Sequence, residues 1–172
     1  MLSLLGADVI KVESPGHGDM MRRIFTDAEM IERGQAPAFL TVNLGKRGIT
    51  LDLKSEAGQE VAWKLIEGAD VMIENYRVGV MSRMGFGYDA VRARNPKIIY
   101  CSISGYGQSG PRAEEPAFDS AVQAVSGMMS QTGYAETGPT RTGYLAVDTS
   151  TGLTAALAIS SALLRRERFG EG

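Results

Sequence analysis

The chain has 172 residues, a formal net charge of -2 and 44% hydrophobic residues, which suit a globular domain of ordinary size. The near-neutral charge excludes the strong positive field of a typical nucleic-acid-binding protein, so we expect no nucleic-acid partner. A single cysteine, Cys101, and a single histidine, His17, exclude internal disulfides and cysteine-cluster metal sites, so we expect no metal and a cytoplasmic location.

The first half of the chain shows strand patterns followed by a helix pattern. The run VIKVE at residues 9–13 is rich in β-branched residues and ends at Ser-Pro-Gly, which predicts a strand. ITLDL at 49–53 predicts a second strand. Ser55 is then placed as the N-cap of a helix that continues to about Gly68.

The second half repeats this alternation. DVMIE at 70–74 predicts a third strand, residues 88–94 a short helix, and KIIYCSIS at 97–104 a strand apolar enough to be buried on both faces. Helical spacing returns at 119–130 and again at 149–164. The stretch 149–164 is shorter than the roughly 20 residues of a membrane span and contains several hydroxyls, so we predict a buried helix and no membrane association.

This order of elements predicts an α/β fold: an open Rossmann-like parallel sheet with flanking helices. The chain begins in what resembles the end of a helix and stops at the turn FGEG. We therefore expect the sheet to be incomplete at both ends and residues 1–172 to be a partial domain of a longer protein.

The segment GYGQSG at 105–110 matches the G-x-G-x-x-G pattern of dinucleotide-binding proteins and follows a predicted strand. That pattern must also open a helix whose amides bind the pyrophosphate. Here Pro111 and loop-forming residues follow instead, and no strand ending in an acidic residue lies at the required distance. We predict that the chain binds neither NAD nor FAD.

Five phrases occur in one order along nearly the whole chain, and together they resemble the class III CoA-transferase family. This family includes formyl-CoA transferase and carnitine CoA-transferase and is related to the α-methylacyl-CoA racemases. The resemblance implies that residues 1–172 are a partial CoA-binding α/β large domain of a longer chain, which forms an interlocked homodimer. The phrases are GADVIKVESPGHGD at 6–19, NLGKRGITLDLKSEAG at 43–58, ADVMIENYRVG at 69–79, NPKIIYCSISGYGQSGP at 95–111 and VDTSTGLTAALAISSALLRRERFGEG at 147–172.

By this resemblance Asp148 is the catalytic residue, because it occupies the family's D-x-x-x-G motif ahead of an apolar helix. We expect Asp148 to lie just before that helix, whose unpaired amides would keep its carboxylate ionised. The carboxylate would attack the thioester of an acyl-CoA donor, and an aspartyl anhydride and then an aspartyl-CoA thioester would pass CoA to a carboxylic acid acceptor. From the residues alone, an ordinary helix N-cap is the favoured interpretation of Asp148, and only the resemblance favours catalysis.

The resemblance also implies where coenzyme A binds. One set of residues would flank the adenine, a second would hold the pantetheine and pyrophosphate, and a third would line the thiol end. Without the family, the charged members are expected to be solvated and Tyr76 to belong to the core. The three sets are Leu51, Asp52, Leu53 and Lys54; Asn75, Tyr76, Arg77 and Arg83; and Pro116, Ala117, Phe118 and Asp119.

Two positions depart from relatives. Many relatives have an arginine for the CoA phosphates where this chain has Ser14, so we expect that contact to weaken or to move to Lys46, Arg47 or His17. The racemases have a histidine at the position of Phe118, which serves as one half of an acid/base pair. Phe118 therefore favours a transferase. A racemase and an inactive CoA-binding fragment remain the alternatives.

Overall fold

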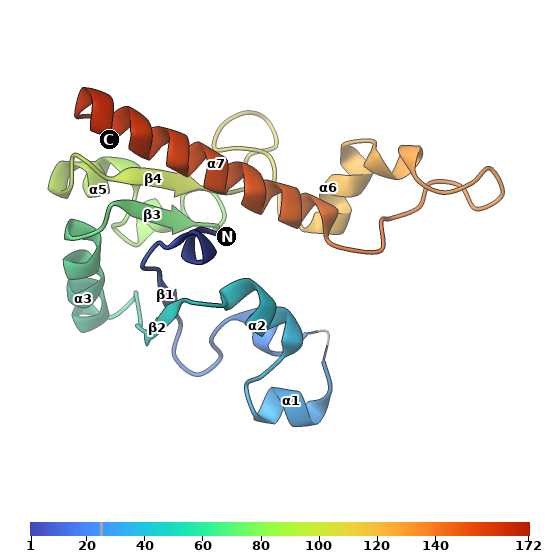
Figure 1. Ribbon diagram of the computed structural model, residues 1–172, viewed down its shortest axis with the longest axis horizontal. Helices are drawn as coiled ribbons and strands as arrows, with labels where there is room; N and C mark the ends of the chain where they lie inside the picture. Colours follow the sequence, from blue (N-terminus) through green and yellow to red (C-terminus); the bar gives the residue numbers. More distant parts are fainter. Residues whose placement is uncertain (25) are drawn as a thin grey trace. The chain divides into compact units, whose positions relative to one another are not determined.

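The computed structural model describes residues 1–24 and 26–172, and the chain divides into two compact units, Met1–Glu67 and Gly68–Gly172. The first unit is built on two parallel strands, β1 (Ile10–Glu13) and β2 (Arg47–Thr50). A short 3-10 helix, η1 (Leu2–Leu5), precedes β1, and α3 (Glu56–Glu67) follows β2 (Figure 1). The crossover from β1 to β2 contains η2 (Met20–Arg22), α1 (Ala28–Glu32) and α2 (Pro37–Asn43).

The second predicted strand, 49–53, is wrong in its second half. Pairing ends at Thr50 opposite Glu13, and only the Leu51 amide continues it, with a hydrogen bond to the Glu13 carbonyl at 3.0 Å. The Asp52 carboxylate accepts from the Lys54 amide at 3.0 Å and so turns the chain toward α3. Ser55 Oγ accepts from the Gly58 amide at 3.1 Å, which confirms Ser55 as the cap of the predicted helix.

The second unit has the same plan, with β3 (Val71–Glu74) parallel to β4 (Ile99–Ser102). Between them lie α4 (Val80–Arg83) and α5 (Tyr88–Arg94), the latter as predicted, and after them α6 (Asp119–Val125), η3 (Met128–Gln131) and α7 (Ala146–Phe169). The helix predicted at 119–130 is split at Gly127, whose φ of 82° is left-handed and ends α6. β4 is less buried than predicted, since only Ile99 is fully buried and its other three residues are half-buried.

The predicted α/β class, with parallel strands and flanking helices, is confirmed. Among the described residues, the strands form two two-stranded sheets, one in each unit. The Rossmann-like topology and the single partial domain stay predictions.

Helix α7 corrects the prediction for residues 149–164. It has 24 residues, and Ile159 packs into the unit while Leu157 is 70% exposed, so the predicted buried helix is exposed on most of its surface. By length and composition alone α7 is long and apolar enough to cross a membrane, a test that core helices of globular proteins also pass. The argument that this segment is too short for a span is therefore wrong, and the absence of membrane association stays a prediction.

The carboxyl end of α7 is attached to the amino ends of both strands of this unit. Arg166, whose side chain is 14% exposed, pairs with the Asp70 carboxylate at 2.7 Å and donates to the Lys97 carbonyl at 3.1 Å. Asp70 precedes β3 and Lys97 precedes β4, so α7 runs antiparallel to the strands. Figure 1 shows α7 continuing past the arrowheads of β3 and β4 toward α6.

We expect Arg166→Met to lower the free energy of unfolding by about 1 kcal/mol, because the carbonyl of Lys97 loses its donor while the exposed Asp70 partner contributes little. Urea unfolding measures the change. Arg168→Met, at an exposed position in the same helical turn, is the matched control and should change the stability by less than about 0.5 kcal/mol. Equal effects of the two substitutions would contradict the view that Arg166 holds the end of α7 against the sheet.

Candidate functional site

Asp148 lies inside the first turn of α7 and not ahead of the helix. α7 begins at Ala146, so Asp148 is its third residue, and the N-cap position belongs to Leu145, whose side chain makes no capping hydrogen bond. Both expectations for Asp148, a place before the helix and an N-cap role, are therefore wrong. Its residue surface is exposed, so the carboxylate is accessible from outside.

A carboxylate from another helix caps α7. Asp119, the first residue of α6, accepts at one oxygen, Oδ2, from the Val147 amide at 2.8 Å and from the Asp148 amide at 3.1 Å. The Ala146 amide bonds to the Tyr144 carbonyl and the Thr149 amide to the Leu145 carbonyl, so the first four amides of α7 all have acceptors. Packing of α6 against α7 makes this cap possible.

The capping carboxylate belongs to a buried polar network. Asp119 is 4% exposed and Gln123, one turn later in α6, is 0% exposed. Gln123 donates from Nε2 to Asp119 Oδ1, and its Oε1 accepts from the Thr142 amide at 3.0 Å. Both oxygens of Asp119 therefore accept hydrogen bonds, as a buried carboxylate requires. The predicted place of Asp119 at the thiol end of CoA stays a prediction.

The helix amides around Asp148 are arranged differently from the prediction. Desolvation, and then the negative charge of Asp119, raise the pKa of the Asp148 carboxyl above its ordinary value. The amides expected to favour its ionisation are already bonded to Asp119. A carboxylate with a raised pKa is more basic, and hence a stronger nucleophile once ionised.

The remaining predicted residues of this unit lie at the carboxyl edge of its sheet, where ligands bind in parallel α/β structures. Asn75, Tyr76 and Arg77 follow β3 directly and are exposed, as is Arg83 at the end of α4. Tyr76 is 44% exposed, so its alternative place in the core is wrong.

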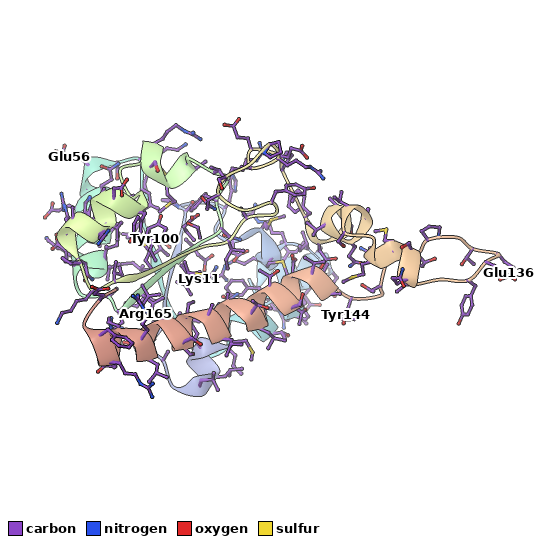
Figure 2. All side chains as sticks on the ribbon, turned by 90° about the horizontal axis from the view of Figure 1, so that it is seen from above. Lys11, Glu56, Tyr100, Glu136, Tyr144 and Arg165 are labelled. Carbon is purple, nitrogen blue, oxygen red and sulfur yellow. The ribbon has the colours of Figure 1, made fainter. Side chains whose placement is uncertain are left out.

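The residues before α6 are the third predicted set. Pro116 and Phe118 are exposed and Ala117 is half-buried, and Phe118, at 71% exposure, is the N-cap residue of α6. Asp148 and Arg166 are 18 residues apart, so Asp148 lies about 27 Å along the helix from the Arg166–Asp70 ion pair. Figure 2 shows Tyr144 just before α7, and the loop that ends at Thr142 extending away from α6 with Glu136 in its outer part.

In the first unit, Leu51, Asp52, Leu53 and Lys54 follow the carboxyl end of β2, beside an open cleft of about 440 Å³. Ser14, His17 and Thr50 line this cleft. Glu13, the last residue of β1, accepts two hydrogen bonds at 2.8 Å from Arg22, which lowers the pKa of Glu13 to about 2 and fixes the loop between them.

Of the three residues proposed to replace the arginine at Ser14, His17 alone is in the cleft lining. Arg47 pairs with Asp8 at 2.6 Å, at the opposite end of the strands, and Lys46 donates to Asn43 at 2.8 Å. Arg23, which was not among the residues predicted from the sequence, also lines the cleft, and its Nη1 atom lies 3.2 Å from Nδ1 of His17. The sequence signal that could have identified Arg23 is the basic pair Arg22-Arg23, which follows the glycine-containing turn at 15–18.

Among the described residues, no cluster of three or more histidine, cysteine or acidic side chains is arranged to hold a metal ion. The only histidine, His17, is in the first unit.

The comparisons with known proteins agree along the whole chain. Residues 1–172 match the model of CoA-transferase family III. The chain is 44% identical over 173 residues to an acetyl-CoA:oxalate CoA-transferase of Acetobacter aceti, and the match covers 100% of this chain and 43% of that protein. It is 41% identical over 175 residues to a succinate–glutarate CoA-transferase of Agrobacterium fabrum, and this match covers 100% of this chain and 44% of that protein. A solved CAIB/BAIF family protein from Brucella suis superposes with a TM-score of 0.91 at 43% identity, covering 99% of this chain and 45% of its own. The chain spans less than half the length of these relatives.

Proposed function

Because the chain belongs to CoA-transferase family III, we propose that the protein containing residues 1–172 transfers coenzyme A from an acyl-CoA thioester to a free carboxylic acid. The observation that supports this most directly is the exposed Asp148 carboxylate in the first turn of α7, held by the buried Asp119. Two relatives are named as CoA-transferases, one for acetyl-CoA and oxalate and one for succinate and glutarate, and these names support CoA transfer as the reaction class.

In this proposal Asp148 is the nucleophile. Its carboxylate attacks the donor carbonyl, which forms an acyl-aspartyl anhydride and releases CoA thiolate. The thiolate attacks the aspartyl carbonyl, so that an aspartyl-CoA thioester forms and the donor acid leaves. The acceptor carboxylate then displaces the thiolate to form a second anhydride, and the thiolate attacks the acceptor carbonyl, which yields the new acyl-CoA and regenerates Asp148. One thioester replaces another, so the exchange needs neither ATP nor a metal.

CoA enters this scheme as a substrate with three groups of contacts. Leu51, Asp52, Leu53 and Lys54 flank the adenine, where the lysine stem covers apolar surface. Asn75, Tyr76, Arg77 and Arg83 hold the pantetheine and pyrophosphate, while Pro116, Ala117 and Phe118 line the thiol end. His17 and Arg23 add two basic groups for a phosphate, because they line a cleft beside the adenine segment.

Three further proposals follow from the family and the composition. The 172-residue chain forms part of a longer protein, since its relatives are more than twice as long. That protein is an interlocked homodimer in the cytoplasm, the location that a single cysteine favours. The 172-residue chain alone binds CoA without completing transfer, because residues beyond it contribute to the reaction.

Transfer and racemisation are separated by one experiment in heavy water. We expect the full-length protein to convert a 2-methylacyl-CoA and an added carboxylic acid into a new CoA ester, with no deuterium at the α-carbon. The reason is that Phe118, whose ring cannot accept a proton, stands where a racemase has its histidine. Mass spectrometry of both CoA esters measures the two rates together. Deuterium entry as fast as transfer would support the racemase. The inactive alternative is tested on residues 1–172 alone, which should bind CoA and transfer none.

A further inference from the structure

We propose that Asp119 is a positioning residue for Asp148, acting through the two amides of α7 that meet at its Oδ2 atom. This inference rests on the proposed function, because it assigns Asp119 a part in the reaction of Asp148. This role does not require Asp119 to touch the substrate. Its contribution is to fix the backbone from which the reacting side chain projects.

The first support is that a buried carboxylate replaces a much simpler cap. A serine, threonine or aspartate at position 145 would satisfy the free amides of α7 from the surface, at little desolvation cost. Leu145 stands there instead, without a capping bond, and the acceptor is an Asp119 side chain that is only 4% exposed. Burying a carboxylate is costly unless each oxygen is hydrogen-bonded, so this cap joins α6 rigidly to the start of α7.

The second support is geometric. The two amides that bond to Asp119 Oδ2, at 2.8 and 3.1 Å, belong to Asp148 itself and to the residue before it. These bonds hold the two successive peptide planes that lead into the Asp148 Cα atom, and so they help to fix the direction of its side chain. Displacement of a reacting group by about 1 Å lowers a rate by up to about a hundredfold. The raised pKa of Asp148, caused in part by Asp119, agrees with this closeness.

The third support is the direction of the hydrogen bonds, which also suggests the test. Gln123 donates from its amide nitrogen to Asp119 and accepts with its amide oxygen from the Thr142 amide. In Asp119→Asn the new amide NH2 group faces the NH2 group of Gln123, and two donors oppose each other. In the double variant Asp119→Asn/Gln123→Glu the new amide donates to the new carboxylate, whose second oxygen accepts from Thr142. Every bond of the network is restored in the double variant.

We would compare these variants in the full-length protein by steady-state kinetics on the folded fraction. Asp119→Asn should lower kcat for CoA transfer by about 10- to 100-fold and change KM for acyl-CoA by less than about threefold, since the binding groups stay in place. The double variant should recover kcat to within about tenfold of the wild type. Asp89→Asn, the same substitution in the first turn of α5, is the matched control and should leave kcat unchanged.

Hydrogen exchange of the segment that contains Val147 and Asp148 gives a second readout that needs no activity. Protection should fall in Asp119→Asn and return in the double variant. The inference would be overturned by a folded Asp119→Asn variant with wild-type kcat, by a folded double variant that regains neither kcat nor protection, or by a loss of activity that only follows the loss of folded protein. If the wild type shows protection but no CoA transfer, the proposed function fails and the positioning role fails with it. The exchange data distinguish that result from a failure of the cap.

Discussion

Asp148→Asn should lower CoA transfer by about ten-thousandfold, because an amide cannot replace a carboxylate as the attacking group. The substitution keeps the size of the side chain, so the affinity for CoA should change by less than about tenfold. A transfer rate within tenfold of the wild type would show that Asp148 is not the nucleophile, and the anhydride scheme would be abandoned.

Oxygen-18 in the acceptor acid tests the covalent step directly. When CoA thiolate attacks the second anhydride, the bond that breaks leaves one acceptor oxygen on Asp148. The tryptic peptide Thr142–Arg165 of the wild type should therefore gain the label, and the peptide of the Asp148→Asn variant should not. Label that stays entirely in the acceptor and its CoA ester would contradict a mechanism through Asp148.

The stability of Asp148→Asn supplies the control for folding. The pKa of Asp148 is raised in the folded chain, so the folded state holds this proton more tightly than the unfolded state. Ionisation of Asp148 therefore lowers stability as the pH rises from its ordinary pKa of 3.8 through the raised value. At pH 7 the asparagine variant should melt at a higher temperature than the wild type, and this difference should shrink as the pH falls below 3.8. A variant that melts lower at pH 7 would contradict the raised pKa.

Gly58→Ala should destabilise the first unit by about 3 kcal/mol, although alanine is intrinsically the better helix former. Gly58 is buried in the first turn of α3, where a Cβ atom would lie 2.0 Å from the Asp52 carbonyl oxygen and 2.9 Å from Ser55 Oγ. The nearest obstacle is backbone, so relief of the clash must displace residues 51–54, the proposed adenine contacts. KM for acyl-CoA should rise together with the loss of stability.

Gly152→Ala is the matched control for this prediction. Gly152 is also inside a helix, α7, but a Cβ atom added there would meet no neighbouring atom within 4 Å. Only the higher helix propensity of alanine over glycine should then matter, and it should stabilise the chain by up to about 1 kcal/mol. Thermal and urea unfolding of the two variants should show shifts of opposite sign. A stabilising Gly58→Ala would mean that α3 does not pack on the Asp52 carbonyl.

Local chemistry in the sequence was enough to predict most elements. The Ser55 cap acts within one turn of chain, so α3 begins where the pattern placed it. The helix α5 ends at Arg94, just before Asn95-Pro96, because proline disfavours a helical residue ahead of it. The strand errors come from turns that side chains close locally, as Asp52 does after Thr50. Burial was predicted less well. The apolar repeat of α7 is real, yet a repeat does not show how much of a helix surface its neighbours cover, and here Leu157 is exposed.

For the site, the sequence by itself predicted the family and the helix and singled out Asp148 as the candidate, because a motif and its order along the chain are properties of the sequence alone. Only the tertiary structure decided that Asp148 is inside the first turn of α7 and that its backbone amide donates a hydrogen bond to the Asp119 carboxylate. The two aspartates are 29 residues apart, and their bond depends on how α6 packs against α7. The pKa of a carboxyl is set by its solvation and by nearby charge in space, so the pattern around Asp148 did not show that its pKa is raised.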